Sequence, residues 1–146
     1  MNKVYYFAYG SNINSKNMHK TCPNAKALGI SLLNDYEFSF MGNKGSAIAC
    51  VFEKLGKSVP VVVWELPQSD LGKLTNYVTL PYLYKKYEKQ VVFGGKKLKG
   101  IMYFPTLNLK ACLPNQDYIS TLREGYTEHG MDMSVLDEAI QQTKGE

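Results

Sequence analysis

The segment Tyr6–Asn12, with the sequence YFAYGSN, is the stretch of this chain best suited to bind a reacting group. An aromatic and apolar run ends abruptly there in glycine, serine and asparagine. Glycine permits backbone conformations that other residues avoid, so successive N–H groups at Gly10, Ser11 and Asn12 can point into one concavity. Such a concavity binds a carboxylate or stabilises an oxyanion. The same residue types are common in tight turns, so a plain turn after a strand is the alternative interpretation.

Other reactive groups are few and scattered. Ser11 carries a hydroxyl, but His19 and His129 are distant from it in sequence, which favours a hydrogen-bonding role for Ser11 over a Ser–His pair. The three cysteines are widely separated and show no CxxC or Cys/His spacing, so free thiols are expected rather than a zinc site or a disulfide framework. The sequence indicates no metal and no organic cofactor.

The elements that must position the loop alternate between strands and helices. Strands are expected over Lys3–Tyr9, Ala25–Leu33, Tyr36–Met41, Ala47–Glu53, Val59–Leu66, Tyr84–Phe93 and Leu98–Phe104, with turns at Asn34-Asp35 and Gly94-Gly95. Helices are expected over Ser15–Lys20, Pro67–Tyr77, Pro114 to a stop at Gly130, and Ser134–Thr143, where Ser134 and Asp137 form a capping box. The pattern predicts an α+β fold whose mixed sheet closes toward a barrel with flanking helices.

Composition narrows the class of protein. The chain has 146 residues, of which 45% are hydrophobic and 21% charged, which argues against disorder, collagen-like repeats and coiled coils. A single domain over residues 1–146 is expected. The net charge, 17 − 13 = +4, requires neither a nucleic acid nor an anionic membrane. No apolar stretch approaches the roughly 18–20 residues of a membrane helix and no signal-peptide pattern is visible, so a cytoplasmic protein is expected.

Tyr6–Asn12 resembles the signature loop of the γ-glutamyl cyclotransferase-like family. The likeness spans nearly the whole chain. It continues at Met18, Pro23, Ala25 and Gly29, at Val61–Leu66, at Asp70, Leu71 and Leu74, at Tyr84 and Lys86, and at Pro114–Tyr118, Gly125, His129, Gly130 and Leu136. The resemblance implies a small mixed β-barrel with helices packed at its side and a cavity at one end. It also implies no cofactor.

The resemblance further implies a reaction. Family members release 5-oxoproline from γ-glutamyl amino acids or amines, because the substrate's own α-amine attacks its γ-carbonyl. A glutamate takes the proton of the amine, and the signature loop stabilises the oxyanion. By this resemblance the ligand-binding residues are Tyr9, Gly10, Ser11, Asn12, Val78, Tyr84 and Tyr118.

The sequence departs from the family where the glutamate is expected. Val78 stands at that position and Thr79 at the following glycine, and valine cannot accept a proton. Three interpretations stay open: an inactive relative that binds a small carboxylate or γ-glutamyl ligand, a different base, or different chemistry such as acyl or aminoacyl transfer. Candidate substitute bases are Glu88, Glu65, Asp70 and Glu37, of which Glu88 is the first choice because it lies four residues beyond Tyr84 on an expected strand.

Lysines flank the expected hairpin at Gly94-Gly95. They are Lys85, Lys86, Lys89, Lys96, Lys97 and Lys99. A nucleic-acid patch is one interpretation, but charged strand edges protected from pairing are commoner and no nucleic-acid motif accompanies them. The expected partner is therefore a small γ-glutamyl or carboxylate ligand, with no membrane partner and with a homodimer left open.

Overall fold

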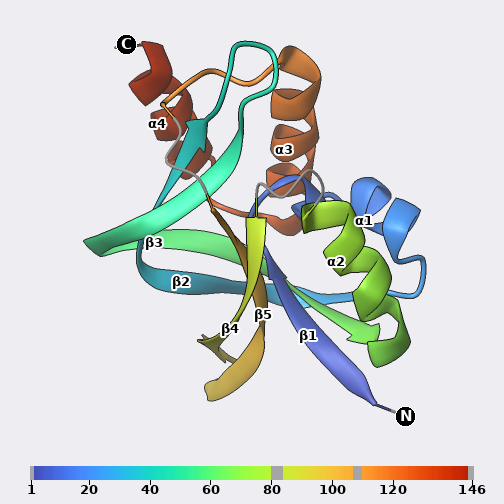
Figure 1. Ribbon diagram of the computed structural model, residues 1–146. Helices are drawn as coiled ribbons and strands as arrows, with labels where there is room; N and C mark the ends of the chain where they lie inside the picture. The colour runs from blue at the N-terminus through green and yellow to red at the C-terminus, as the bar shows by residue number, and fades with distance from the viewer. Residues whose placement is uncertain (1, 80–83, 107–109, 145–146) are drawn as a thin grey trace.

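A five-stranded mixed sheet forms the centre of the molecule (Figure 1). The computed structural model describes residues 2–79, 84–106 and 110–144, with the side chains of 77–79 and 144 outside that description. The strands are β1 (Lys3–Ala8), β2 (Lys26–Met41), β3 (Ile48–Pro67), β4 (Tyr84–Phe93) and β5 (Lys96–Pro105), in the order β2-β3-β1-β5-β4. β1 is central because its aromatic and apolar side chains are buried between an antiparallel β3 and a parallel β5.

The long hairpin β2–β3 replaces four shorter strands that the sequence predicts. The expected break at Asn34-Asp35 is wrong, because the chain passes through it as a bulge with Asp35 at φ 65°. The N–H of Gly56 on β3 donates to Asp35 Oδ1 at 3.1 Å, which holds the bulge in place. Aspartate tolerates the left-handed backbone region, so Asp35 can adopt this conformation while β2 stays paired with β3 on both sides of it.

The hairpin β4–β5 confirms the expected turn at Gly94-Gly95. Both glycines have positive φ, 61° and 78°, as a two-residue hairpin turn requires. β4 and β2 are the two edges of the sheet, and among the described residues no backbone pairing joins them. The α+β class with a mixed sheet is therefore confirmed, but the sheet is open, and "barrel" describes it only loosely.

Four α-helices flank the sheet in the described part of the chain. They are α1 (Ser15–Thr21), α2 (Leu71–Thr79, after the short 3-10 helix η2, Gln68–Asp70), α3 (Gln116–His129) and α4 (Met133–Lys144). α3 ends at Gly130 in the left-handed conformation, as predicted. The expected capping box of the last helix is wrong, because Asp132 accepts the Ser134 N–H at 3.0 Å and Asp137 pairs with Arg123. No helix among the described residues has the length and apolar character needed to cross a membrane.

Candidate functional site

The loop after β1 turns at once into a short 3-10 helix, η1 (Ser11–Ile13). The N–H of Ile13 donates to the carbonyl of Gly10 at 3.0 Å, which closes the turn. Within the described chain, no hydrogen bond uses the N–H groups of Ser11 or Asn12. These two N–H groups are therefore available to an anionic oxygen.

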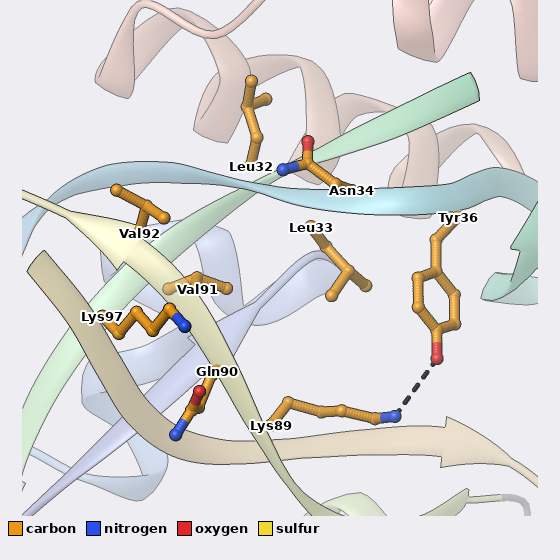
Figure 2. A pocket seen from close by; sticks show the side chains of 9 residues that line it. All are labelled: Leu32, Leu33, Asn34, Tyr36, Lys89, Gln90, Val91, Val92 and Lys97. Atoms are coloured by element: carbon orange, nitrogen blue, oxygen red, sulfur yellow. Dashed lines mark hydrogen bonds between the residues drawn. The ribbon is translucent and has the colours of Figure 1, made fainter. Parts of the chain in front are cut away.

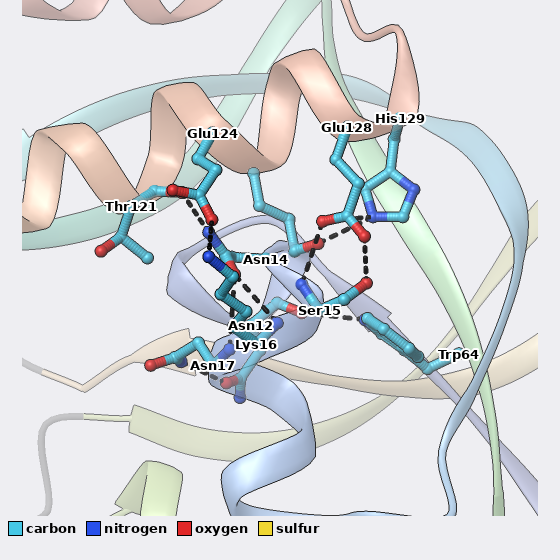
Figure 3. A network of polar contacts seen from close by, with 11 residues as sticks. Asn12, Asn14, Ser15, Lys16, Asn17, Trp64, Thr121, Glu124, Glu128 and His129 are labelled. Carbon is cyan, nitrogen blue, oxygen red and sulfur yellow. Dashed lines mark hydrogen bonds and ion pairs between the residues drawn. The ribbon is translucent and has the colours of Figure 1, made fainter.

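The side chain of Asn12 holds this loop in place. Its Nδ2 donates to Tyr6 Oη at 3.2 Å, and its Oδ1 accepts from Asn17 Nδ2 at 2.8 Å. Its backbone carbonyl accepts from the indole Nε1 of Trp64 at 2.9 Å (Figure 3). Asn12 is buried, so these bonds are shielded from water. Its side chain supports the loop, which leaves its backbone N–H as the group free for a ligand.

Two tyrosine hydroxyls meet at Ala49 of β3. Ala49 lies beyond the reach of β1, which pairs only with residues 62–67 of β3. Tyr84 Oη donates to the Ala49 carbonyl at 2.5 Å, and the Ala49 N–H donates to Tyr118 Oη at 3.0 Å. Gly10 faces the same point, since a Cβ there would lie 3.5 Å from Ala49 Cβ and 3.6 Å from Tyr118 Oη. The loop, β4 and α3 thus converge on one backbone position, and three of the predicted residues come together.

The surroundings of these hydroxyls are apolar and carry little charge. Burial raises the pKa of Tyr84 and of Tyr9 well above the usual value, and Tyr118, Tyr6 and Cys50 add smaller contributions in the same direction. None of these described neighbours is a carboxylate. Burial also raises the pKa of the Cys50 thiol to about 12. The tyrosines are therefore neutral hydrogen-bonding groups, and Cys50 is a protonated thiol rather than a nucleophile.

Tyr103 links the loop to α2, through its backbone carbonyl on one side and its hydroxyl on the other. Tyr9 Oη donates to the Tyr103 carbonyl at 2.7 Å, and Tyr103 Oη shares a hydrogen bond with Thr75 Oγ1 at 2.9 Å. Position 78 lies one helical turn beyond Thr75. The side chain of Val78 is outside the described residues, so its place at the ligand stays a prediction.

Glu88 is in solvent in this structure. Its side chain is 67% exposed and forms an ion pair with Lys99 at 3.6 Å, whereas Tyr84 on the same strand is largely buried. β4 pairs with β5 without a register shift from Tyr84 to Phe93, so Glu88 leaves the same face of the strand as Tyr84, but its described ion pair is with Lys99. A role for Glu88 as substitute base stays a prediction.

The other candidate carboxylates lie elsewhere. Glu65 pairs with Lys3 at 3.2 Å, and Glu37 lies opposite Phe52 in the β2–β3 hairpin. Asp70 is buried, but it precedes position 78 by eight residues of helix, or about 12 Å. In the described chain, none of the three side chains forms a hydrogen bond or an ion pair with the loop.

The described hydrogen bonds of His19 and His129 do not involve the Ser11 side chain. His19 Nε2 bonds to the Ala25 carbonyl and His129 Nε2 to the Ile13 carbonyl, each at 2.9 Å. The described residues contain no group of three or more His, Cys, Asp or Glu side chains arranged to hold a metal ion. The geometry therefore agrees with a hydrogen-bonding loop rather than a Ser–His pair.

A polar network that the sequence did not predict fastens α1 to α3 (Figure 3). Asn14 caps α1 by accepting the N–H of Lys16 at 3.0 Å. Glu128 on α3 accepts the N–H of Ser15 at 3.1 Å and also its Oγ. The Asn-Ser pair at the start of α1 is a capping signal that can be recognised in the sequence. Glu128, the partner of Ser15, lies 113 residues away and cannot be found from local sequence. This network fixes the C-terminal side of the loop.

Comparison with known proteins identifies the family. Residues 6–129 match the sequence profile described as "Gamma-glutamyl cyclotransferase, AIG2-like". The chain belongs to this family. The Homo sapiens protein named gamma-glutamylcyclotransferase is 28% identical over 137 residues, which cover 88% of this chain and 72% of the relative. The Mus musculus protein of the same name is 27% identical over 135 residues, covering 86% and 71%.

Solved structures agree on the fold of this γ-glutamyl cyclotransferase family member. A structure titled gamma-glutamyl cyclotransferase superposes with a TM-score of 0.84 at 26% identity, covering 94% of this chain and 86% of that one. YkqA from Bacillus subtilis superposes with a TM-score of 0.80 at 19% identity, covering 99% and 55%, and shows the fold alone. The family match includes the loop, α2, Tyr84 and Tyr118, and it ends before α4.

Proposed function

We propose that this γ-glutamyl cyclotransferase family member binds a γ-glutamyl amino acid or amine and releases 5-oxoproline. The observation that carries the proposal is the pair of free N–H groups at Ser11 and Asn12, next to Gly10 and the Tyr118 hydroxyl. The family membership and the relatives named gamma-glutamylcyclotransferase support the same reaction.

The reaction needs three things from the protein. The substrate's α-amine must lose a proton and form a C–N bond to its own γ-carbonyl carbon, which requires a bent conformer. The carbonyl oxygen then becomes an oxyanion, for which the Ser11 and Asn12 N–H groups are suitable donors. The C–N bond to the leaving amine breaks, and the leaving amine takes up a proton. The partly buried side chains of Tyr84 and Tyr118 supply apolar rings and hydrogen-bonding hydroxyls as a wall for the substrate.

A second candidate function is binding without turnover. It is favoured by valine at position 78 and by the lack of a carboxylate among the described groups that influence Tyr9 and Tyr84. Without a base the α-ammonium of the ligand stays protonated at neutral pH. Loss of a general base reduces rates by about 10²–10⁴.

The test is 5-oxoproline release from a panel of γ-glutamyl amino acids and amines. Wild type, Val78→Glu and Val78→Gln are compared, because glutamine matches glutamate in shape but is not a base. Direct binding of each compound is measured in parallel by calorimetry.

Turnover by wild type supports the proposal, and Glu88→Gln then asks whether Glu88 is the base. Turnover by Val78→Glu alone, with binding by all three proteins, replaces the proposal with the binding function. Absence of both binding and turnover in every protein refutes γ-glutamyl recognition altogether.

A further inference from the structure

The two open edges of the sheet face each other across a seam, and the seam contains a cavity (Figure 2). Ser31 Oγ on β2 donates to the Val92 carbonyl on β4, and the ring of Phe93 lies against Gly29. Further along, Lys89 Nζ on β4 donates to Tyr36 Oη on β2 at 3.2 Å. Between these bridges the edges line an open cavity of about 270 Å³.

The floor of this seam cavity holds an ammonium group without a carboxylate partner. Lys89 Nζ lies 5.6 Å from the ring centre of Tyr36 and 5.3 Å from that of Phe104, and these two rings stack on each other. Among the described residues neither Lys89 nor Lys97, which also lines the cavity, forms an ion pair. An ammonium has three N–H donors, of which the Tyr36 hydroxyl takes one. The aromatic rings hold the cation in place while leaving donors for an anion.

The walls of the seam cavity are apolar. Leu33 and Val91 are buried at 4% exposure each, whereas Leu32 and Val92 are 52% and 60% exposed. Exposed branched aliphatic side chains beside a cavity are sites where burial by a ligand is favourable. A fixed cation at the floor and aliphatic walls above it match a molecule with a carboxylate head and an aliphatic tail.

We infer that the seam cavity between β2 and β4 binds a small aliphatic carboxylate, with its carboxylate on Lys89 and its tail along Leu32 and Val92. The Tyr36 hydroxyl lies beside the head, and Asn34 and Gln90 also line the cavity. The ligand is a small molecule rather than an inserted β-strand, because the Ser31–Val92 bond and the packing of Phe93 on Gly29 hold the edges together at one end. The seam cavity shares no residue with the loop, Tyr84 or Tyr118, so this site is separate from the proposed cyclotransferase site.

Amide and methyl NMR of the full chain tests the inference, with octanoate as the probe. Octanol, which has the tail without the charge, and acetate, which has the charge without the tail, are the ligand controls. Saturable shift changes at the cavity residues are expected, with octanoate binding at least tenfold more tightly than either control.

Three variants locate the site. Lys89→Met keeps the aliphatic chain and removes the charge, and it is expected to weaken octanoate binding about ten- to a hundredfold, the size of a charge-assisted hydrogen bond. Val92→Asp places a like charge on an exposed wall and is expected to abolish binding. Lys96→Gln, on the same hairpin but outside the seam cavity, is the matched control and is expected to bind as wild type does.

Several results overturn the inference: equal affinity for octanol and octanoate, shift changes that map elsewhere, or unchanged binding by Val92→Asp or by a folded Lys89→Met. Absence of saturable binding by wild type overturns it as well. None of these results bears on 5-oxoproline release, so the two proposals fail independently.

Discussion

Gly125 lies inside α3 where that helix crosses the loop helix η1. A Cβ at this position would lie 2.5 Å from Ile13 Cγ1, 2.9 Å from Ile13 Cδ1 and 3.1 Å from the backbone nitrogen of Asn14. Ile13 is fully buried, so its side chain has no open space into which to move. Glycine is therefore needed here for close approach of the two backbones, although it is a poor helix former.

Two opposing effects set how much Gly125→Ala changes the free energy of unfolding. Alanine improves helix propensity by about 0.8–1.0 kcal/mol. Forcing a methyl group into a packed contact costs about 1–3 kcal/mol. The net effect is a loss of up to about 2 kcal/mol, which lowers the melting temperature by up to about 6 °C for a chain of this size.

Urea unfolding followed by circular dichroism measures this change, and Gly72→Ala is the matched control. Gly72 lies in α2, and nothing lies within 4 Å of the Cβ it would gain, so alanine there is expected to stabilise by up to about 1 kcal/mol. Ile13→Ala should cost less in the Gly125→Ala background than in wild type, because the new methyl occupies part of the space that Ile13 leaves. Stabilisation by Gly125→Ala equal to that of Gly72→Ala would refute the close-approach argument.

Three further outcomes are expected. Tyr118→Phe leaves the Ala49 N–H without its acceptor and should destabilise the protein by about 1–3 kcal/mol in urea unfolding; an unchanged midpoint would contradict a stabilising role for this hydrogen bond. Partial burial raises the pKa of Glu128, but the hydrogen bonds from Ser15 outweigh it and hold the pKa below the usual range. The stability that Glu128 provides is therefore present above the unfolded pKa of about 4.3 and is lost as the pH falls through the lowered folded value. Glu128→Gln should thus lower the melting temperature at pH 7, and the difference from wild type should shrink by pH 3; a pH-independent difference would contradict the ionic role. Because burial raises the pKa of Cys50 to about 12, iodoacetamide at pH 8 should not modify it in the native protein but should do so in urea, as mass spectrometry of peptides will report.

Local chemistry explains which elements the sequence predicts well. The end of β4 at Phe93 is predicted to the residue because a Gly-Gly pair follows it, and the positive φ angles of a tight hairpin turn favour glycine. The end of α3 at Gly130 has the same kind of local cause. By contrast, Asn34-Asp35 has strong turn propensity, and only the continuous pairing of β2 with β3 converts it into a bulge. Long-range pairing of this kind leaves no trace in local residue types.

The candidate site also contains some features that local sequence predicts and others that depend on the fold. The loop and its free N–H groups follow from residue types within seven positions, so the sequence predicts them. Ala49 contributes through its backbone N–H and carbonyl, and Tyr103 contributes its carbonyl to Tyr9, so neither role depends on a recognisable side-chain pattern. The partnership of Ser15 with Glu128 joins residues 113 positions apart. Such groups become visible only when the fold brings the elements together.

Described contacts from β1, β3 and α3 hold the loop in place. Asn12 is held by Trp64 and Tyr6, Gly10 packs beside Ala49, and η1 packs on α3 through Ile13. None of these contacts comes from the C-terminal end of α2, so under the proposed function valine at position 78 removes a proton acceptor while these supports of the Ser11 and Asn12 N–H groups stay. The proposed function therefore treats binding and turnover as separable. A glutamate restored at position 78 would add a base to a loop that is already in place, which is why the Val78→Glu comparison tests the chemistry rather than the folding of the site.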